Sequence, residues 1–121
     1  MKISIDKEHA IAILEPEERL TKEDFDKAVK EIDPFIEAHG KLNGVIIETE
    51  KFPGWEDFAA LSRHFVFVKN HHKKIRKLAF VTNSVVGTFA EKVSSHFVEA
   101  EIRTFPYDEM DAAREWIVEK A

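Results

Sequence analysis

The chain has 121 residues, 44% of them hydrophobic and 34% charged, a balance typical of one soluble globular domain spanning residues 1–121. Its net charge of −5 disfavours general nucleic-acid binding, and the lack of cysteine excludes disulfides, thiolate metal sites and thiol nucleophiles. The N-terminus has no apolar core of the kind found in signal peptides, and no apolar run is long enough to cross a bilayer. We therefore expect a cytoplasmic protein that is soluble or, at most, peripheral at the inner membrane face.

The first third of the chain predicts two strands followed by a helix. Residues 3–5 and 10–14 alternate between apolar and polar around a short polar turn, which is typical of a β-hairpin. Thr21 is suited to cap a helix, and the apolar residues after it recur at helical spacing. Gly40 is suited to end this helix, whereas Pro34 should kink it or start a separate short turn.

The rest of the chain continues to alternate strands with helices. Short apolar or alternating runs predict three further strands, at residues 44–49, 77–81 and 100–104, the last as a half-covered edge strand. We expect a helix from about Trp55 to Asn70, another capped by Ser84, and a last helix capped by Asp108.

This order, ββαβαβαβα, predicts an α/β fold. Strands that alternate with helices form right-handed crossovers and a mostly parallel sheet, while the leading hairpin adds an antiparallel edge. We therefore expect a mixed sheet of about five strands with about four helices. Ligands of such sheets usually lie beyond the carboxyl ends of the parallel strands, here at residues 49–55 and 82–84.

Five segments carry a resemblance to a known family. They are LTKEDF (20–25), FPGW (52–55), IRKLAFV (75–81), AEIRTF (100–105) and AAREW (112–116). In this order and spacing, the chain resembles the SpoIIAA-like proteins, a STAS/SEC14-like group related in fold to anti-sigma-factor antagonists. The resemblance implies the STAS fold over nearly the whole chain. Fold relatives include phospho-switched signalling domains and lipid-carrying domains, so the resemblance leaves the function open.

The phospho-switch of the signalling relatives has no counterpart at the matching place. In those relatives, a phosphorylatable Ser follows the third strand and starts the next helix. The matching stretch here is TEKFPGW (49–55), in which Thr49 ends the strand and no Ser follows. Phe52 and Trp55 take that loop instead. A kinase-regulated switch at this position is therefore not expected.

Aromatic and polar residues meet at the predicted carboxyl edge of the sheet. An apolar crevice with a few polar anchors is the usual form of a small-ligand site. The candidate ligand-binding residues are Thr49, Phe52, Trp55, Phe58, Asn83 and Ser84. Two alternatives stay open: Trp55 begins a core-facing stripe, and Ser84 is only a helix cap.

The predicted helix at 55–69 has one residue that a core-facing stripe does not explain. On a helical wheel, Leu61, Phe65 and Val66 belong to a wide apolar half. Phe67 falls among the polar residues beside Arg63. The basic run that follows suggests a membrane or partner surface made of Phe67, Lys69, Lys73 and Lys74. The alternatives are that Phe67 packs under a loop or a dimer partner, and that the lysines only mark a helix end.

Nothing in the sequence points to catalysis, a metal or a cofactor. It has no nucleophile elbow, Walker A loop or dinucleotide-binding glycine motif. The adjacent His71 and His72 would project in different directions from a helix and make poor joint metal ligands. We therefore expect a non-enzymatic module that binds a hydrophobic or amphipathic small molecule, with an anionic membrane surface as a further partner. The alternative is a STAS-type protein–protein signalling adaptor without the phospho-switch. A homodimer through the 55–69 helix fits both hypotheses.

Overall fold

The structure, a computed structural model, describes residues 1–51, 54, 58–83 and 101–119, and the statements below concern them. Side chains at 58, 59, 61, 62, 65, 68, 69 and 72 also lie outside this description. The elements in chain order are β1 (Lys2–Asp6), β2 (Ile11–Glu15), α1 (Lys22–His39), β3 (Leu42–Glu48), α2 (Phe58–His71), the short 3₁₀ helix η1 (His72–Lys74), β4 (Ile75–Val81), β5 (Glu101–Phe105) and α4 (Met110–Val118).

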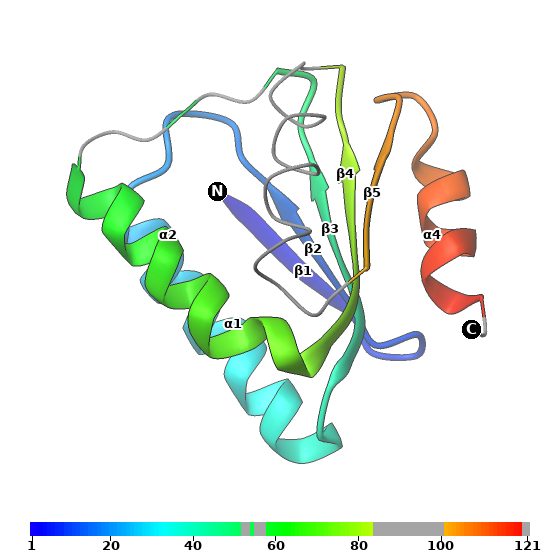
Figure 1. Cartoon of the computed structure of the whole chain (residues 1–121), viewed down its shortest axis with the longest axis horizontal. Helices are drawn as coiled ribbons and strands as arrows, with labels where there is room; N and C mark the ends of the chain where they lie inside the picture. The colour runs from blue at the N-terminus through cyan, green and yellow to red at the C-terminus, as the bar shows by residue number, and fades with distance from the viewer. Residues whose placement is uncertain (52–53, 55–57, 84–100, 120–121) are drawn as a thin grey trace.

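The five described strands form one mixed sheet in the order β1-β2-β3-β4-β5 (Figure 1). β1 is antiparallel to β2, and each following neighbour pair is parallel. Ile46 in the central strand pairs with Ile13 on one side and Ala79 on the other. The predicted α/β class, hairpin and five-stranded mixed sheet are thereby confirmed.

Helices cover both faces of the sheet, and each covered face has its own core. Alternation along a strand sends successive side chains to opposite faces. In β2, Ile11 and Ile13 therefore join the cluster under α4, while Ala12 and Leu14 join the cluster under α1. In Figure 1, α1 and α2 lie together on one side of the sheet and α4 lies on the other.

Gly44 in β3 lets α4 approach the sheet closely. A Cβ atom at this position would lie 2.5 Å from Cγ2 of Ile117, a residue of α4 that is fully buried. Contacts below about 3 Å between carbon atoms are strongly repulsive, since their favourable separation is about 3.5–4.0 Å. The absence of a side chain at residue 44 is therefore what allows α4 to dock at this depth.

α1 is a single helix of 18 residues that continues through Pro34, so the separate short turn considered there does not form. Thr21 caps it as predicted: its hydroxyl accepts from Asp24 N at 3.1 Å, and its own N–H donates to the Asp24 carboxylate at 2.9 Å. Pro34 is exposed, while Ile32 and Phe35 on either side of it are buried. Burial of these neighbours offsets the one intrahelical hydrogen bond that proline removes.

The described residues contain three α-helices instead of the expected four. The helix expected after Ser84 falls within residues 84–100, outside the described part of the chain. The last helix begins one residue later than predicted. Glu109 rather than Asp108 precedes its first turn, because a turn in which Glu109 N donates to Pro106 O at 2.9 Å lengthens the connection.

Candidate functional site

The carboxyl ends of β3, β4 and β5 lie side by side and are joined by main-chain hydrogen bonds. Thr49 N donates to Val81 O at 3.1 Å, and Thr82 N donates to Phe105 O at 3.0 Å. Asn83 N donates to Glu50 O at 3.1 Å. The loops that leave the sheet at this edge therefore form one connected surface, at the place where α/β sheets usually bind ligands.

The buried threonines of this edge shape the loops. Thr49 Oγ1 donates to Lys51 O at 3.0 Å, and Thr82 Oγ1 donates to Glu50 O at 3.2 Å. The Thr49 hydroxyl thus uses its one hydrogen to donate to a main-chain carbonyl, and its oxygen can still accept a hydrogen bond. The candidate anchor Thr49 can therefore meet a ligand only as an acceptor while this loop arrangement holds.

Asn83 and Tyr107 form the exposed part of the same edge. Asn83 Oδ1 accepts from Tyr107 N at 3.1 Å, which leaves the Asn83 amide N–H groups as donors at the surface. Tyr107 is 39% exposed and lies two residues after the end of β5. Tyr107 was not predicted from the sequence as a site residue. It is the only tyrosine of the chain and follows the proline that ends a strand, which could have indicated a functional loop residue.

Three of the predicted ligand residues, Phe52, Trp55 and Ser84, lie outside the described residues. Phe58 is the first residue of α2, but its side chain is outside the description. Gly54, in the same loop, is described: its carbonyl accepts from Leu20 N at 2.8 Å. The loop that carries FPGW is therefore tied to the segment just before α1.

The face that α2 turns toward α1 differs from the face that the helical wheel predicted. Ala60 and His71 are buried, and Phe67 is partly buried with its ring tilted against Phe25 of α1, 6.4 Å between centroids. Val66, predicted as core, is 51% exposed. The contact stripe is therefore Ala60, His64, Phe67 and His71, whose 4-3-4 spacing lines one side of a helix. Phe67 fills a helix–helix contact and is not the exposed residue that the wheel left unexplained.

His64 lies in this contact as an uncharged ring. Its imidazole stacks on Phe25, with 5.1 Å between ring centroids and 23° between planes. Burial lowers the pKa of His64 from 6.5 to about 4, because the surrounding apolar groups do not solvate the charged form.

Arg76 and Lys77, which follow the exposed Lys73 and Lys74, contact α4 on the opposite face of the sheet from α1 and α2. Lys77 is only 4% exposed, and its Nζ donates to Trp116 O at 2.6 Å and to Glu119 O at 3.1 Å. Arg76 Nη2 donates to Ile117 O at 2.9 Å and to Glu119 O at 2.8 Å. Both cations thus bind the carbonyls at the C-terminus of α4, where positive charge is favourable. They do not belong to a surface patch.

Lys73 and Lys74 are exposed, as the surface hypothesis requires, while the side chain of Lys69 is outside the description. Of the α2 side chains that the structure describes, Val66 is the large apolar one that is exposed, at 51%, whereas Phe67 is partly buried. Among the described side chains of α2, Val66 rather than Phe67 is therefore the apolar residue that a membrane or partner could contact.

A groove lies between β5 and α4, on the side of the sheet away from α1. It is open, has a volume of about 530 Å³, and is lined by Arg103, Phe105, Ala112, Glu115, Trp116, Val118 and Glu119. The Arg103 guanidinium lies 5.0 Å from the centre of the Phe105 ring. The lining therefore combines apolar side chains with charged ones of both signs.

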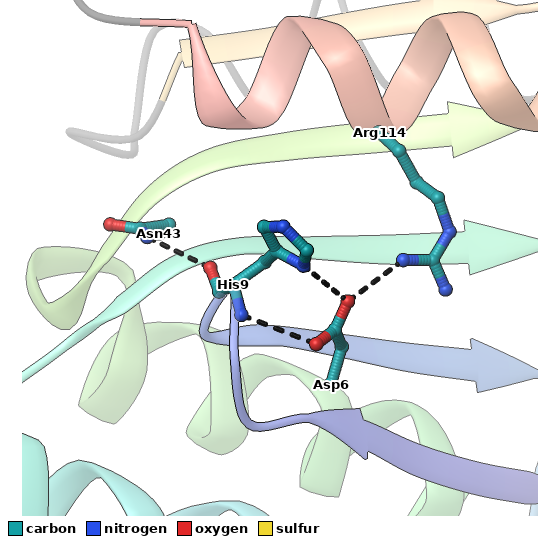
Figure 2. A network of polar contacts seen from close by, with 4 residues as sticks. All are labelled: Asp6, His9, Asn43 and Arg114. Atoms are coloured by element: carbon teal, nitrogen blue, oxygen red, sulfur yellow. Dashed lines mark hydrogen bonds and ion pairs between the residues drawn. The ribbon is translucent and has the colours of Figure 1, made fainter.

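A polar network at the amino edge of the parallel strands ties the hairpin turn to α4 (Figure 2). Asp6 Oδ2 accepts from His9 Nδ1 at 2.9 Å and from Arg114 Nη1 at 3.0 Å, and Asn43 Nδ2 donates to His9 O at 2.8 Å. Burial raises the pKa of Asp6, but the hydrogen bonds from His9 and Arg114 outweigh it and leave that pKa below its usual value. The network is far from the carboxyl edge and fixes the fold around it.

The described residues hold no group of three or more histidine or acidic side chains arranged to share a metal ion. No helix in the same ranges combines the length and apolar character needed to cross a membrane.

Comparison with known proteins identifies the family. The model of the SpoIIAA-like family matches residues 11–118. The chain belongs to the SpoIIAA-like family. A similar solved structure is that of an uncharacterised DUF3478-family protein with a SpoIIAA-like fold from Shewanella loihica PV-4. It shares 16% identity, with a TM-score of 0.75 over 96% of this chain and 90% of that one. No curated protein sequence matches the chain. The resemblance seen in the sequence is thus confirmed for the SpoIIAA-like family and its fold.

Proposed function

We propose that this SpoIIAA-like domain is a non-enzymatic binding module that takes a hydrophobic or amphipathic small molecule at the carboxyl edge of its parallel strands. The observation that carries the proposal is the exposed pair of Asn83 and Tyr107 on an edge where three strands end together. The pair offers amide donors beside an aromatic ring, which suits a molecule with a polar head and an apolar body. Phe52 and Trp55 in the neighbouring loop would extend the apolar part.

Native mass spectrometry of freshly purified protein tests the proposal directly. We expect an added mass that is lost on denaturation and that extraction identifies as a lipid-like molecule. A fluorescent derivative of dodecanoic acid serves as the probe for titration of the stripped protein. A bare mass, together with no saturable binding of this probe, contradicts the proposal.

Matched variants locate the site. Asn83→Ala and Tyr107→Ala should each weaken probe binding about tenfold, since one good hydrogen bond or ring contact contributes on the order of 1.4 kcal/mol. Asn70→Ala is the control, because Asn70 is also an exposed asparagine but lies near the C-terminal end of α2, away from the carboxyl edge. Equal binding by all three variants would place the site elsewhere.

Peripheral membrane association is a second part of this proposal. Lys73 and Lys74 are exposed beyond the end of α2, and Val66 is an exposed apolar residue on that helix. Each lysine near an anionic surface contributes about 1 kcal/mol, and salt screens this attraction. We expect sedimentation with phosphatidylserine-containing vesicles at low salt, loss of it at high salt, and a weaker effect in a Lys73→Glu, Lys74→Glu variant. Protein that stays in the supernatant at low salt contradicts this part alone.

The groove between β5 and α4 favours the alternative, a protein–protein signalling adaptor. Its lining includes the apolar Trp116 and Val118 and the charged Arg103 and Glu115. Aromatic and arginine residues are enriched at protein interfaces. An adaptor predicts a single stoichiometric partner in a pull-down, and Val118→Asp should abolish its capture without changing probe binding at the carboxyl edge.

A further inference from the structure

The contact between α1 and α2 ends in a histidine whose ring is bonded on both sides. His71 is the last residue of α2 and is 6% exposed. Its Nδ1 lies 2.7 Å from Phe67 O, and its Nε2 lies 2.5 Å from Asp33 Oδ1 on α1. The ring also stacks on Phe67, with 4.2 Å between centroids. Each polar atom of the imidazole is therefore in a defined contact.

Both partners of the ring accept hydrogen bonds. A main-chain carbonyl has no hydrogen to give, and an ionised carboxylate has none either. Each ring nitrogen of His71 therefore needs its own hydrogen. A neutral imidazole carries one N–H and an imidazolium carries two, so only the charged ring satisfies both contacts at once.

Three features of the site compensate for burying this charge. The Asp33 carboxylate lies within hydrogen-bond distance, and its side chain is 48% exposed, so the pair keeps part of its hydration. His71 also lies at the C-terminus of α2, where the helix dipole favours a cation. Charge-assisted hydrogen bonds of this kind are stronger than neutral ones.

Other titratable or charged groups lie along the same junction without taking these contacts. His64 stacks on Phe25 of α1, and Arg63 pairs with Asp26 of α1 at 3.6 Å. On η1, which follows α2 directly, Lys73 and Lys74 are exposed. Among the described residues, Asp33 is the acid that bonds the His71 ring.

We propose that the α1–α2 contact is closed by a doubly protonated His71 and loosens when that ring loses a proton. The packed form holds a proton that an unfolded chain releases near pH 6.5. Proton linkage then gives the sign: the contribution is complete below that pH and is lost as pH rises above it. One proton corresponds to at most a tenfold change in the unfolding equilibrium constant per pH unit.

Imidazole NMR of the folded protein tests the protonation state. Long-range ¹H–¹⁵N spectra report whether each ring nitrogen carries a hydrogen. At about pH 7, where a free imidazole is mostly neutral, we expect His71 to show two N–H groups. Asp33→Asn should convert it to a neutral ring at the same pH. A wild-type His71 with hydrogen on Nδ1 alone would overturn the proposal.

Urea unfolding between about pH 6 and pH 8 tests the linkage with a matched pair of variants. Asp33→Asn and His71→Gln should remove most of the fall in the unfolding midpoint that the wild type shows as pH rises across this window. Asp26→Asn is the control, because Asp26 lies on the same helix and pairs with Arg63, which does not titrate in this range. An unchanged pH dependence in Asp33→Asn, or its equal loss in Asp26→Asn, would contradict the proposal.

Discussion

The two helix packings on opposite faces of the sheet are built from neighbouring parts of one segment, yet they differ in chemistry. Residues 60–71 supply histidine and phenylalanine rings to the contact with α1. Residues 76 and 77 supply two cations that bind the carbonyl groups at the end of α4. Histidine and aspartate titrate within the range of pH that proteins meet, whereas lysine, arginine and carbonyl groups do not. We therefore expect pH to act on the first packing and to leave the contacts of Arg76 and Lys77 with α4 unchanged.

Phe67→Asp should lower the stability of the α1–α2 packing more than any of the substitutions that follow. The substitution removes a ring that contacts Phe25 and His71, and it places a carboxylate in the helix–helix contact. We expect a loss of more than about 3 kcal/mol in the free energy of unfolding, because a large apolar side chain is lost and a charge is introduced. Urea unfolding measures it. A loss below about 1 kcal/mol would mean that Phe67 is not part of the packing.

Acid should weaken the α1–α2 packing through His64. Its pKa is lowered from 6.5 to about 4, so the unfolded chain takes up a proton at a higher pH than the folded chain does. The contribution of His64 to stability is therefore complete above about pH 6.5 and is lost toward pH 4, by on the order of 3 kcal/mol. Urea unfolding at a series of pH values should show this loss in the wild type but not in His64→Leu. The same acid-induced loss in His64→Leu would assign it to other groups.

Lys77→Met should weaken the packing of α4 at every pH. The methionine fills the buried volume but leaves Trp116 O and Glu119 O without the ammonium donor. We expect a loss of about 2 kcal/mol that does not depend on pH between about 5 and 8. Lys74→Met, at an exposed lysine three residues earlier, is the control and should change stability by less than about 0.5 kcal/mol. Equal effects of the two variants would contradict a special role for Lys77.

Val66→Asp should have the smallest effect on stability. Val66 is the neighbour of Phe67 in sequence but is 51% exposed, so a carboxylate there stays in water. We expect a change within about 0.5 kcal/mol. In vesicle sedimentation, the same variant should reduce binding if the surface around Lys73 and Lys74 contacts membrane. A loss of stability as large as that of Phe67→Asp would show that the two faces of α2 have been assigned wrongly.

The fold could be predicted from the sequence where its signals are local. The hairpin, the Thr21 cap and the parallel strands each depend on residues within a few positions of one another, and these predictions were confirmed. A separate turn at Pro34 does not form, because burial on both sides of the proline holds α1 together. That burial depends on tertiary contacts, which a propensity rule does not include.

The candidate site was harder to predict because its contacts are distant in sequence. The helical wheel assigned Val66 to the core because Val66 lies on the side of α2 with the most apolar residues. In the structure, α2 instead packs on α1 through a stripe that includes His64 and His71. Lys77 bonds a carbonyl 39 residues further on, so nothing near it in the sequence marks it as buried. Asn83 was predicted at the carboxyl edge, but its partner Tyr107 lies 24 residues away, and only the sheet order brings the two together.

Because α4 approaches the sheet closely at Gly44, the space available to residue 44 is limited by the side chain of Ile117. Volume added at one position must be removed at the other, so substitutions at the two positions should be coupled rather than additive. In related chains, a side chain at the position of Gly44 should coincide with a smaller residue at the position of Ile117. The distance between α4 and the sheet should therefore depend on the combined side-chain volume at residues 44 and 117, which are distant in the sequence.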